Sequence, residues 1–261
     1  MITVHVAGIG LCGPGLADWA TGSAVLRGEA PPGGDTPKPA AAILPPAERR
    51  RSGPATRIAL QAAQEAMTQA GLPPTEAAVV FASSDADGEN LHHILEALAA
   101  PEHEVSPTRF HNSVHNAAAG YWNIATGART PANSLGAFDH SFAAGLLEAA
   151  VQVAAENIPV LLVAFDLPFP APLDEARPIC APFATALLLT PQAGPAPLAQ
   201  LEISLEAAQA DTTMIQPELE ALRAGNPAAR ALPLLQAVAE GRATRITLDY
   251  GANSLSVEVA Q

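Results

Sequence analysis

Apolar runs and helical repeats alternate along the first 190 residues of the chain. Residues 77–83 and 159–165 are almost wholly apolar, as strands buried on both faces of a sheet are. Residues 2–9 are rich in β-branched side chains and end at glycines, which predicts another strand. Helices are predicted around these strands, over residues 16–21, 49–70, 91–99 and 113–125. This succession of strands and helices predicts an α/β fold.

The pattern changes near residue 183. Residues 183–190 and 199–206 predict successive strands, and residues 217–240 predict a helical region. Residues 245–259 predict a closing strand pair.

A helix predicted over residues 139–156 is apolar on nearly every side. Only Glu148 and Gln152 interrupt its apolar surface, and small residues such as Ala143 and Gly145 allow close approach. A helix of this kind belongs inside a structure. We therefore expect a layered sandwich with this helix inside it.

The charge balance excludes two classes of partner. Thirteen basic and twenty-six acidic residues give a net charge of -13, which repels nucleic acid and anionic lipid headgroups. The N-terminus lacks a basic leader region, and no apolar run is long enough for a membrane span, so we expect a cytoplasmic protein without membrane insertion. The two cysteines, Cys12 and Cys180, lack the paired spacing of a zinc or redox motif and are expected to be reduced, packed thiols.

Ordered motifs in the first 190 residues resemble the thiolase-fold β-ketoacyl synthases. VHVAGIGLCGPG resembles the first strand and turn of that family, and RIALQAAQEAMTQAGL the helix before its second strand. NSVHNAAAGYWNIATG resembles an asparagine-containing helix at the dimer interface, and PANSLGAFDHSFAAGLLEAA the strand, nucleophile elbow and central helix. The resemblance implies a thiolase-like layered αβαβα sandwich with an abbreviated C-terminal half. We expect a single ketosynthase-like domain over 1–261, in which 1–190 resembles the N-terminal half and 191–261 a truncated C-terminal half.

The resemblance places Asp139 where the family has its nucleophilic cysteine. Ketosynthases also draw two histidines and a lysine from their second half, but this chain has no histidine after His140 and no lysine after Lys38. A carboxylate is a weak nucleophile and would repel the enolate formed during decarboxylative condensation. Independent condensation activity is therefore not expected, and no catalytic residue is assigned.

Within the superfamily, the chain resembles the short ketosynthase-like proteins of aryl polyene and related type II polyketide or fatty-acid systems. By that resemblance it is a chain-length-factor-like pseudoenzyme in a β-ketoacyl-[carrier protein] synthase complex. The expected partner is a complete ketosynthase, or a second copy of the chain, and acyl carrier protein is reached through the complex. No cofactor or metal is expected. The alternatives are a stand-alone small-molecule-binding protein or hydrolase that uses Asp139 and His140, and a homodimeric scaffold without a ligand.

Asp139, His140 and Ser141 stand side by side at the elbow. Consecutive residues that enter a helix point about 100° apart, so these three alone cannot form a serial Ser-His-Asp relay. The simpler interpretation is a cap, in which the Asp139 carboxylate accepts amide hydrogens at the positive end of the helix. A cap that also mimics an acylated cysteine is the second interpretation.

Polar and aromatic side chains near the elbow are the expected pocket or subunit-contact groups, although the aromatics also suit a core. His111 and His115 lie four residues apart and could share a helix face, but no third metal ligand is evident. The expected pocket or interface residues are Phe110, His111, Asn112, His115, Asn116, Tyr121, Trp122, Phe138 and Phe142.

Overall fold

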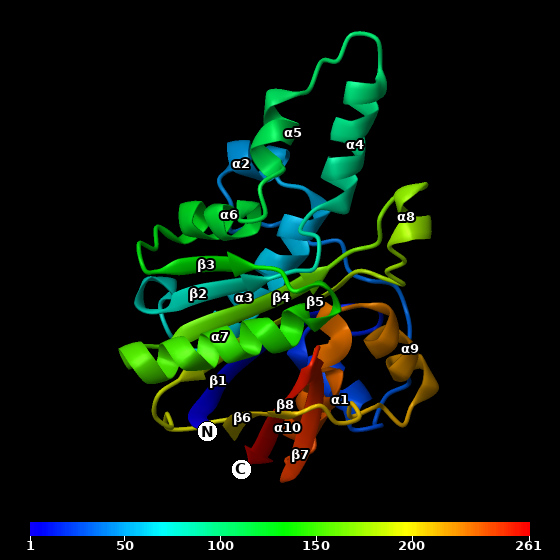
Figure 1. Ribbon diagram of the computed structural model, residues 1–261. Coiled ribbons are helices and arrows are strands. Elements are labelled where there is room, and N and C mark those ends of the chain that lie inside the picture. Colours follow the sequence, from blue (N-terminus) through cyan, green and yellow to red (C-terminus); the bar gives the residue numbers. More distant parts are fainter.

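The computed structural model describes residues 1–261 and places eight strands in one sheet, in the order β3-β2-β4-β5-β1-β6-β8-β7 (Figure 1). The strands are β1 (Ile2–Cys12), β2 (Ala78–Ala82), β3 (Ala132–Leu135), β4 (Val160–Asp166), β5 (Phe183–Thr190), β6 (Ala199–Ala207), β7 (Thr244–Tyr250) and β8 (Asn253–Ala260). The α-helices are α1 (Trp19–Leu26), α2 (Pro46–Arg51), α3 (Pro54–Ala70), α4 (Gly88–Ala99), α5 (Pro107–Asn112), α6 (Ala117–Thr126), α7 (Ser141–Glu156), α8 (Leu173–Ala176), α9 (Pro217–Gly225) and α10 (Leu232–Ala239). Three 3-10 turns complete the structure, η1 (Pro74–Glu76), η2 (Phe138–His140) and η3 (Ala228–Ala231).

The sheet contains a parallel part and an antiparallel part. Strand β2 pairs in parallel with β3 and β4, whereas the remaining neighbours are antiparallel. Every residue of β2 and β4 is buried, which confirms the two strands predicted from continuous apolar runs. Because β2, β3 and β4 run in the same direction, their carboxyl ends meet at one edge of the molecule.

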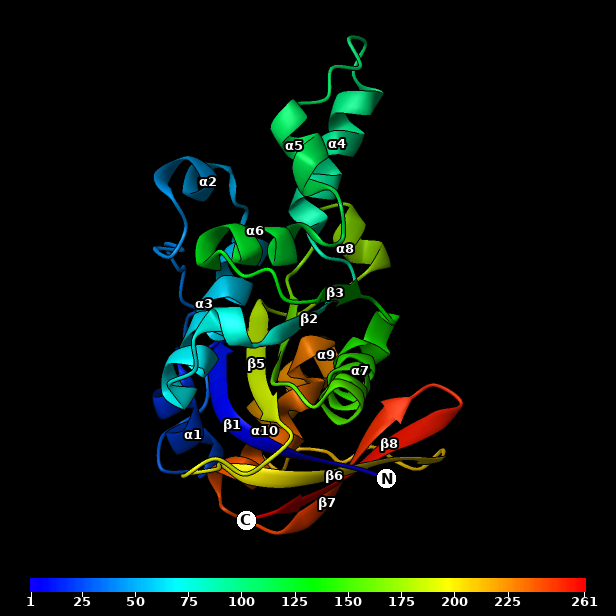
Figure 2. The same ribbon diagram turned by 90° about the vertical axis from the view of Figure 1, so that its left-hand side faces the viewer.

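Strand β1 connects the two parts and bends between them. Its first residues pair with β6 and its later residues pair with β5, with a register shift between Val6 and Gly8. Figure 2 shows the sheet turning through this strand, so that β6, β8 and β7 lie across the end of the first part.

Helices fill both sides of the first part of the sheet. α3 and α6 cover one face, and their buried side chains pack with those of β2, β4 and β5. α7 lies on the other face, in the angle between the two parts, and shares its core with α1, α9, α10 and η3. No helix covers the outer face of β6, β8 and β7, as Figure 2 shows. Charged residues lie on these strands, among them Glu206, Arg245 and Glu258. The predicted α/β class is confirmed.

Close contact between β1 and α3 depends on glycine. A Cβ atom at Gly10 would lie 1.9 Å from the carbonyl oxygen of Ala62, and one at Gly8 would lie 2.1 Å from that of Ala66. α3 starts at Pro54 and ends at Ala70, and the following Gly71 closes the helix in the left-handed conformation, with a φ of 66°.

Several predicted helix boundaries were wrong. The helix predicted over 49–70 is divided into α2 and α3, because Pro54 disfavours helical backbone at the preceding Gly53. The helix predicted over 113–125 starts only at Ala117 and follows a separate α5, and the helix predicted over 16–21 is α1, which starts at Trp19. None of the helices is both long enough and apolar enough to cross a lipid bilayer.

The full enclosure predicted for the helix after the elbow is also wrong. One strip of α7 lies outside the core, with Leu147 and Glu148 half-buried and Val151 and Ala154 exposed. Within this strip, Glu148 accepts a hydrogen bond from Asn133 on β3, the terminal strand of the sheet.

Candidate functional site

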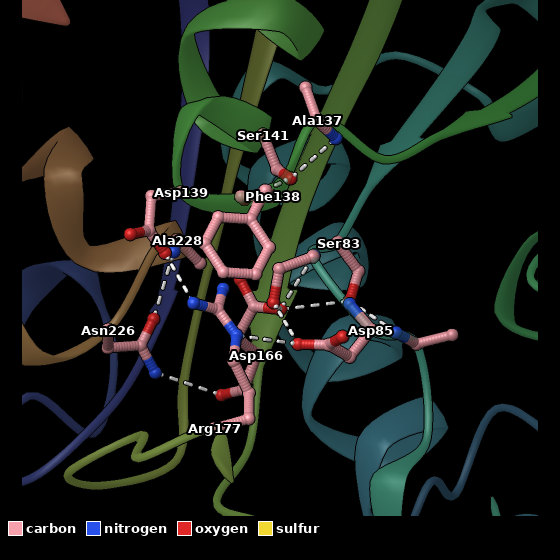
Figure 3. Close-up of polar contacts among 12 residues, drawn as sticks. Ser83, Asp85, Ala137, Phe138, Asp139, Ser141, Asp166, Arg177, Asn226 and Ala228 are labelled. Carbon is pink, nitrogen blue, oxygen red and sulfur yellow. Dashed lines mark hydrogen bonds and ion pairs between the residues drawn. The ribbon is translucent and has the colours of Figure 1, made fainter.

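The carboxyl ends of the three parallel strands bring polar groups together. Ser83–Asp85 follow β2, η2 follows β3, and Asp166 is the last residue of β4. In α/β sheets, binding and catalytic groups gather at this edge. Figure 3 shows that Arg177, from the loop between β4 and β5, reaches into the same cluster.

The elbow is a strained turn that Ser141 holds in place. Phe138 has a φ of 53°, in the left-handed region that residues other than glycine rarely adopt. The buried Ser141 Oγ donates to the Phe138 carbonyl over 2.7 Å and accepts from the Ala137 amide over 3.0 Å. The strain at Phe138 is thus secured by the first residue of α7.

Asp139 forms an ion pair inside this cluster. Its Oδ1 accepts a 2.6 Å hydrogen bond from Arg177 Nη1, and Arg177 Nε donates to Asp85 Oδ2 over 3.1 Å. The Phe138 ring lies over the same guanidinium, 3.8 Å from its centre, and Arg230 approaches Asp139 at 3.8 Å. Burial opposes the charge of Arg177, but the two carboxylates outweigh it and raise its pKa. Arg177 therefore ties the elbow to the loop after β2.

The capping role predicted for Asp139 is wrong. Neither η2 nor α7 has a side-chain cap hydrogen bond at its N-terminus, and α7 starts at Ser141, two residues after Asp139. The carboxylate is instead bound by arginine, because a full positive charge attracts it more strongly than helix amides do.

A serial relay is not formed at the elbow either. Ser141 bonds to backbone groups, while His140 Nδ1 lies 3.4 Å from the carboxylate of Asp249 on β7. The three neighbouring side chains thus point to three different partners. This geometry does not support the hydrolase alternative.

Asp166 is a buried acid beside the ion pairs. Its Oδ1 accepts hydrogen bonds from Ser83 Oγ (3.0 Å), the Ser84 amide (2.8 Å) and Ser84 Oγ (2.8 Å), whereas its Oδ2 has no partner. Burial raises the pKa of Asp166 to about 7, against the opposing effect of the serine hydrogen bonds. Asn226 secures the strand end by donating to the Asp166 carbonyl over 3.0 Å.

The predicted pocket and interface residues do not form one group. Tyr121, Trp122 and Phe142 are buried core residues. Asn112 is also buried, where it accepts from the Tyr121 hydroxyl over 2.9 Å and donates to the Arg51 carbonyl over 2.8 Å.

The other predicted residues remain accessible. Phe110, His111, Asn116 and Phe138 are exposed, and His115 is half-buried with Nε2 3.0 Å from the Ser83 carbonyl oxygen. His111 contacts the edge of Tyr121 instead of sharing a ligand with His115. No group of three or more histidine, cysteine or acidic side chains is placed to hold a metal ion.

Neither of the two cysteines has a reactive thiol. Cys12 is buried, and burial raises its pKa to about 11. Cys180 is exposed, but partial burial of its thiol raises its pKa as well. The thiolate is the nucleophilic form of cysteine, and both environments disfavour it.

Sequence reasoning missed Arg177, Asp85 as its partner, and Asp166. Asp85 and Asp166 had a usable signal, since Asp85 follows and Asp166 ends a continuous apolar strand, and these two strands, β2 and β4, run in parallel. Arg177 had none, because it lies in a long loop, 38 positions after Asp139.

Comparison with known families and structures identifies relatives of this arrangement. A family model described as "Beta-ketoacyl synthase, N-terminal domain" matches residues 19–252. No curated protein sequence matches the chain.

Three solved complexes contain chains of similar fold. One is the ketosynthase ApeO in complex with its chain length factor ApeC from Xenorhabdus doucetiae, with 23% identity, a TM-score of 0.75, and coverage of 99% of this chain and 100% of that chain. A second is the ishigamide ketosynthase/chain length factor, with 16% identity, a TM-score of 0.71 and 99% coverage of both chains. The third is AntDE:AntF, a type II acyl-carrier protein in complex with its ketosynthase bound to the hexaketide, with 12% identity, a TM-score of 0.77 and 99% coverage of both chains. At these identities the likeness shows a shared fold.

Proposed function

This chain belongs to the β-ketoacyl synthase N-terminal-domain family, and we propose that it is a non-catalytic, chain-length-factor-like subunit. It pairs with an active β-ketoacyl synthase in type II polyketide, aryl polyene or fatty-acid biosynthesis. It helps to shape the space in which an acyl chain grows on a carrier protein, in the cytoplasm.

The observation that carries this proposal is the arginine-bound elbow. The family resemblance places Asp139 at the position of the nucleophile, and its carboxylate is held by Arg177 at 2.6 Å. An ion-paired carboxylate is a weak nucleophile, so it cannot hold an acyl group as a thiolate does. It also has no hydrogen-bond donor with which to stabilise an enolate. The elbow is therefore suited to a structural role.

Exposed apolar side chains support pairing with another protein. α4 and α5 project away from the sheet, as Figures 1 and 2 both show. α4 carries an exposed leucine stripe, and α5 and its flanks add Phe110 and Val114; the stripe consists of Leu91, Leu95 and Leu98. Clustered exposed apolar side chains of this kind favour an interaction with another protein.

The free edge of β3 supports the same conclusion. β3 is the terminal strand of the sheet, and the strip of α7 beside it exposes Val151 and Ala154. An unpaired edge strand flanked by an apolar helix strip favours addition of a partner chain. Because the chain carries a charge of -13 and carrier proteins are usually acidic, carrier docking is expected on the partner subunit.

Co-expression tests the pairing directly. The chain is produced alone and together with candidate complete ketosynthases from the same genome, and light scattering after size exclusion gives the mass of each species. A one-to-one complex with a ketosynthase supports the proposal. A chain that stays apart from every ketosynthase contradicts it.

A further inference from the structure

The Ser84 hydroxyl lies between two carboxyl groups. Its Oγ is 2.7 Å from Asp85 Oδ2 and 2.8 Å from Asp166 Oδ1, so both oxygens are within hydrogen-bonding distance. A hydroxyl group has one hydrogen, and Ser84 can therefore donate to only one of the two acids at a time. A carboxylate is a stronger acceptor than a neutral carboxyl group. The protonation state of the acids thus decides which of them receives the Ser84 hydrogen.

Asp166 is the acid whose protonation state changes. It is only 2% exposed and its Oδ2 has no hydrogen-bond partner, whereas Asp85 is half-buried and pairs with Arg177 at 3.1 Å. Burial raises the pKa of Asp166 to about 7. Near neutral pH, Asp166 therefore exchanges between a neutral and a charged form.

A chain of contacts leads from Asp166 to the elbow (Figure 3). Ser84 contacts Asp85, whose Oδ2 also accepts from Arg177 Nε over 3.1 Å. Arg177 Nη1 in turn donates to Asp139 Oδ1 over 2.6 Å. The Nη2 atom of Arg177 is buried and has no partner. The guanidinium thus has a donor left with which to follow a new negative charge.

The other charged and titratable groups around the cluster do not bond to the Asp166 carboxyl group. His115 Nε2 contacts the backbone that follows β2, and the residue opposite Asp166 on β5 is the apolar Phe183. The groups on the elbow side pair with Asp139 or with one another, and they are Arg230, His140, Asp211 and Asp249. Asp85 and Arg177 are therefore the charges through which Asp166 acts.

We propose that the Ser84 hydroxyl is a proton-controlled relay, which locks the elbow while Asp166 is neutral and releases it when Asp166 is ionised. In the neutral form, Ser84 donates to Asp85. Asp85 and Asp139 then hold Arg177 between them.

Ionisation reverses this arrangement. Asp166 loses its proton to water and takes the Ser84 hydrogen. The lone pairs of Ser84 Oγ then face Asp85 Oδ2 at 2.7 Å and repel it. The new charge on Asp166 also draws Arg177 away from Asp139, so the strained turn loses its ion pair. The relay acts whether or not the chain pairs with a ketosynthase.

Hydrogen exchange at the elbow tests the relay. The amides of Ala137 and His140 are bonded within the elbow, each over 3.0 Å. Nuclear magnetic resonance at pH 6 and pH 8 gives their protection factors, which are the intrinsic exchange rates divided by the observed rates. In the wild type we expect protection to fall by about tenfold or more from pH 6 to pH 8. In Asp166→Asn, which is neutral at both pH values, protection should stay within about twofold of the wild-type value at pH 6.

Two further variants isolate the hydroxyl. Ser84→Ala keeps Asp166 but removes the hydroxyl that contacts both acids, so the fall in protection should shrink to less than about threefold. Asp174→Asn is the matched control, because it removes an exposed carboxylate from the same segment between β4 and β5 that carries Arg177. It should show the same fall as the wild type.

Each of four results would overturn the inference. The first is equal protection of the wild type at pH 6 and pH 8. The second is a fall in Asp166→Asn as large as in the wild type, which would come from the nearby histidines that this variant leaves in place. The third is low protection of Asp166→Asn at both pH values, and the fourth is an undiminished fall in Ser84→Ala. The first result needs no variant, so it decides the question even if a variant fails to fold.

Discussion

Replacing Arg177 by methionine tests the ion-paired elbow. Arg177 Nη1 and Nε bond to Asp139 at 2.6 Å and Asp85 at 3.1 Å, and the Phe138 ring lies 3.8 Å from the guanidinium. Methionine keeps the apolar stem of the side chain and removes all three interactions. It also leaves two carboxylates near each other without a cation.

The magnitude follows from these contacts. A hydrogen bond to a charged group contributes about 1.5–3 kcal/mol, and a cation-aromatic contact about 0.5–1 kcal/mol. Arg177 is only 15% exposed, but Asp139 is 36% exposed, so water screens part of that bond. We therefore expect Arg177→Met to lower the free energy of unfolding by about 2–4 kcal/mol.

Urea unfolding measures this loss as a shift of the midpoint at constant slope. Arg27→Met is the matched control, because Arg27 pairs with Glu29 at the surface, at 36% and 57% exposure, and its loss should leave the urea midpoint nearly unchanged. A double-mutant cycle with Asp139→Asn should give a coupling of about 1 kcal/mol between Asp139 and Arg177. If Arg177→Met costs no more than Arg27→Met, the ion pair does not secure the elbow and the reasoning is refuted.

Three further predictions test other parts of the structure. Because burial raises the folded pKa of Asp166 to about 7, above an unfolded value of about 4, its contribution to stability is complete below pH 4 and is lost as the pH rises towards 7 and above. Asp166→Asn should remove this pH-dependent loss of unfolding free energy, which amounts to at most about 4 kcal/mol. Urea unfolding of the wild type and the variant at pH 5 and pH 8 tests this, and midpoints that fall equally in both proteins would contradict it. Gly10→Ala should destabilise the fold by more than about 1 kcal/mol, because its Cβ would lie 1.9 Å from the Ala62 carbonyl oxygen; an unchanged thermal midpoint would show that α3 can move away freely. In Asp139→Cys, the introduced thiol beside Arg177 should react with iodoacetamide faster than Cys180, whose pKa is raised, and should still give no condensation product; equal alkylation rates, or condensation by the chain alone, would count against this account.

The sequence predicted those elements whose pattern depends on burial alone. The runs that became β2 and β4 are buried at every residue, so their composition was sufficient. The end of α3 at Gly71 was also predictable, because a left-handed closing residue favours glycine. Pro54 marks the break between α2 and α3 in the sequence as well. The apolar stripe that follows it favoured a single continuous helix in the prediction.

The site was less predictable, because its contacts join distant segments. The position of Asp139 at the elbow follows from local pattern, but its arginine partner comes from a loop whose path depends on the whole fold. The exposed strip of α7 could not be recognised either. Its alanine, leucine and valine side chains suit a core as well as an interface, and only the position of β3 at the sheet edge distinguishes the two.

Reconstitution of condensation tests the central claim most directly. Malonyl carrier protein and an acyl carrier protein starter are incubated with this chain alone, with a candidate ketosynthase alone, and with both, and mass spectrometry identifies the carrier-bound products. The account predicts no product from this chain alone, and products from the pair whose yield or length differs from those of the ketosynthase alone. Condensation by this chain alone, or identical products with and without it, would contradict the account.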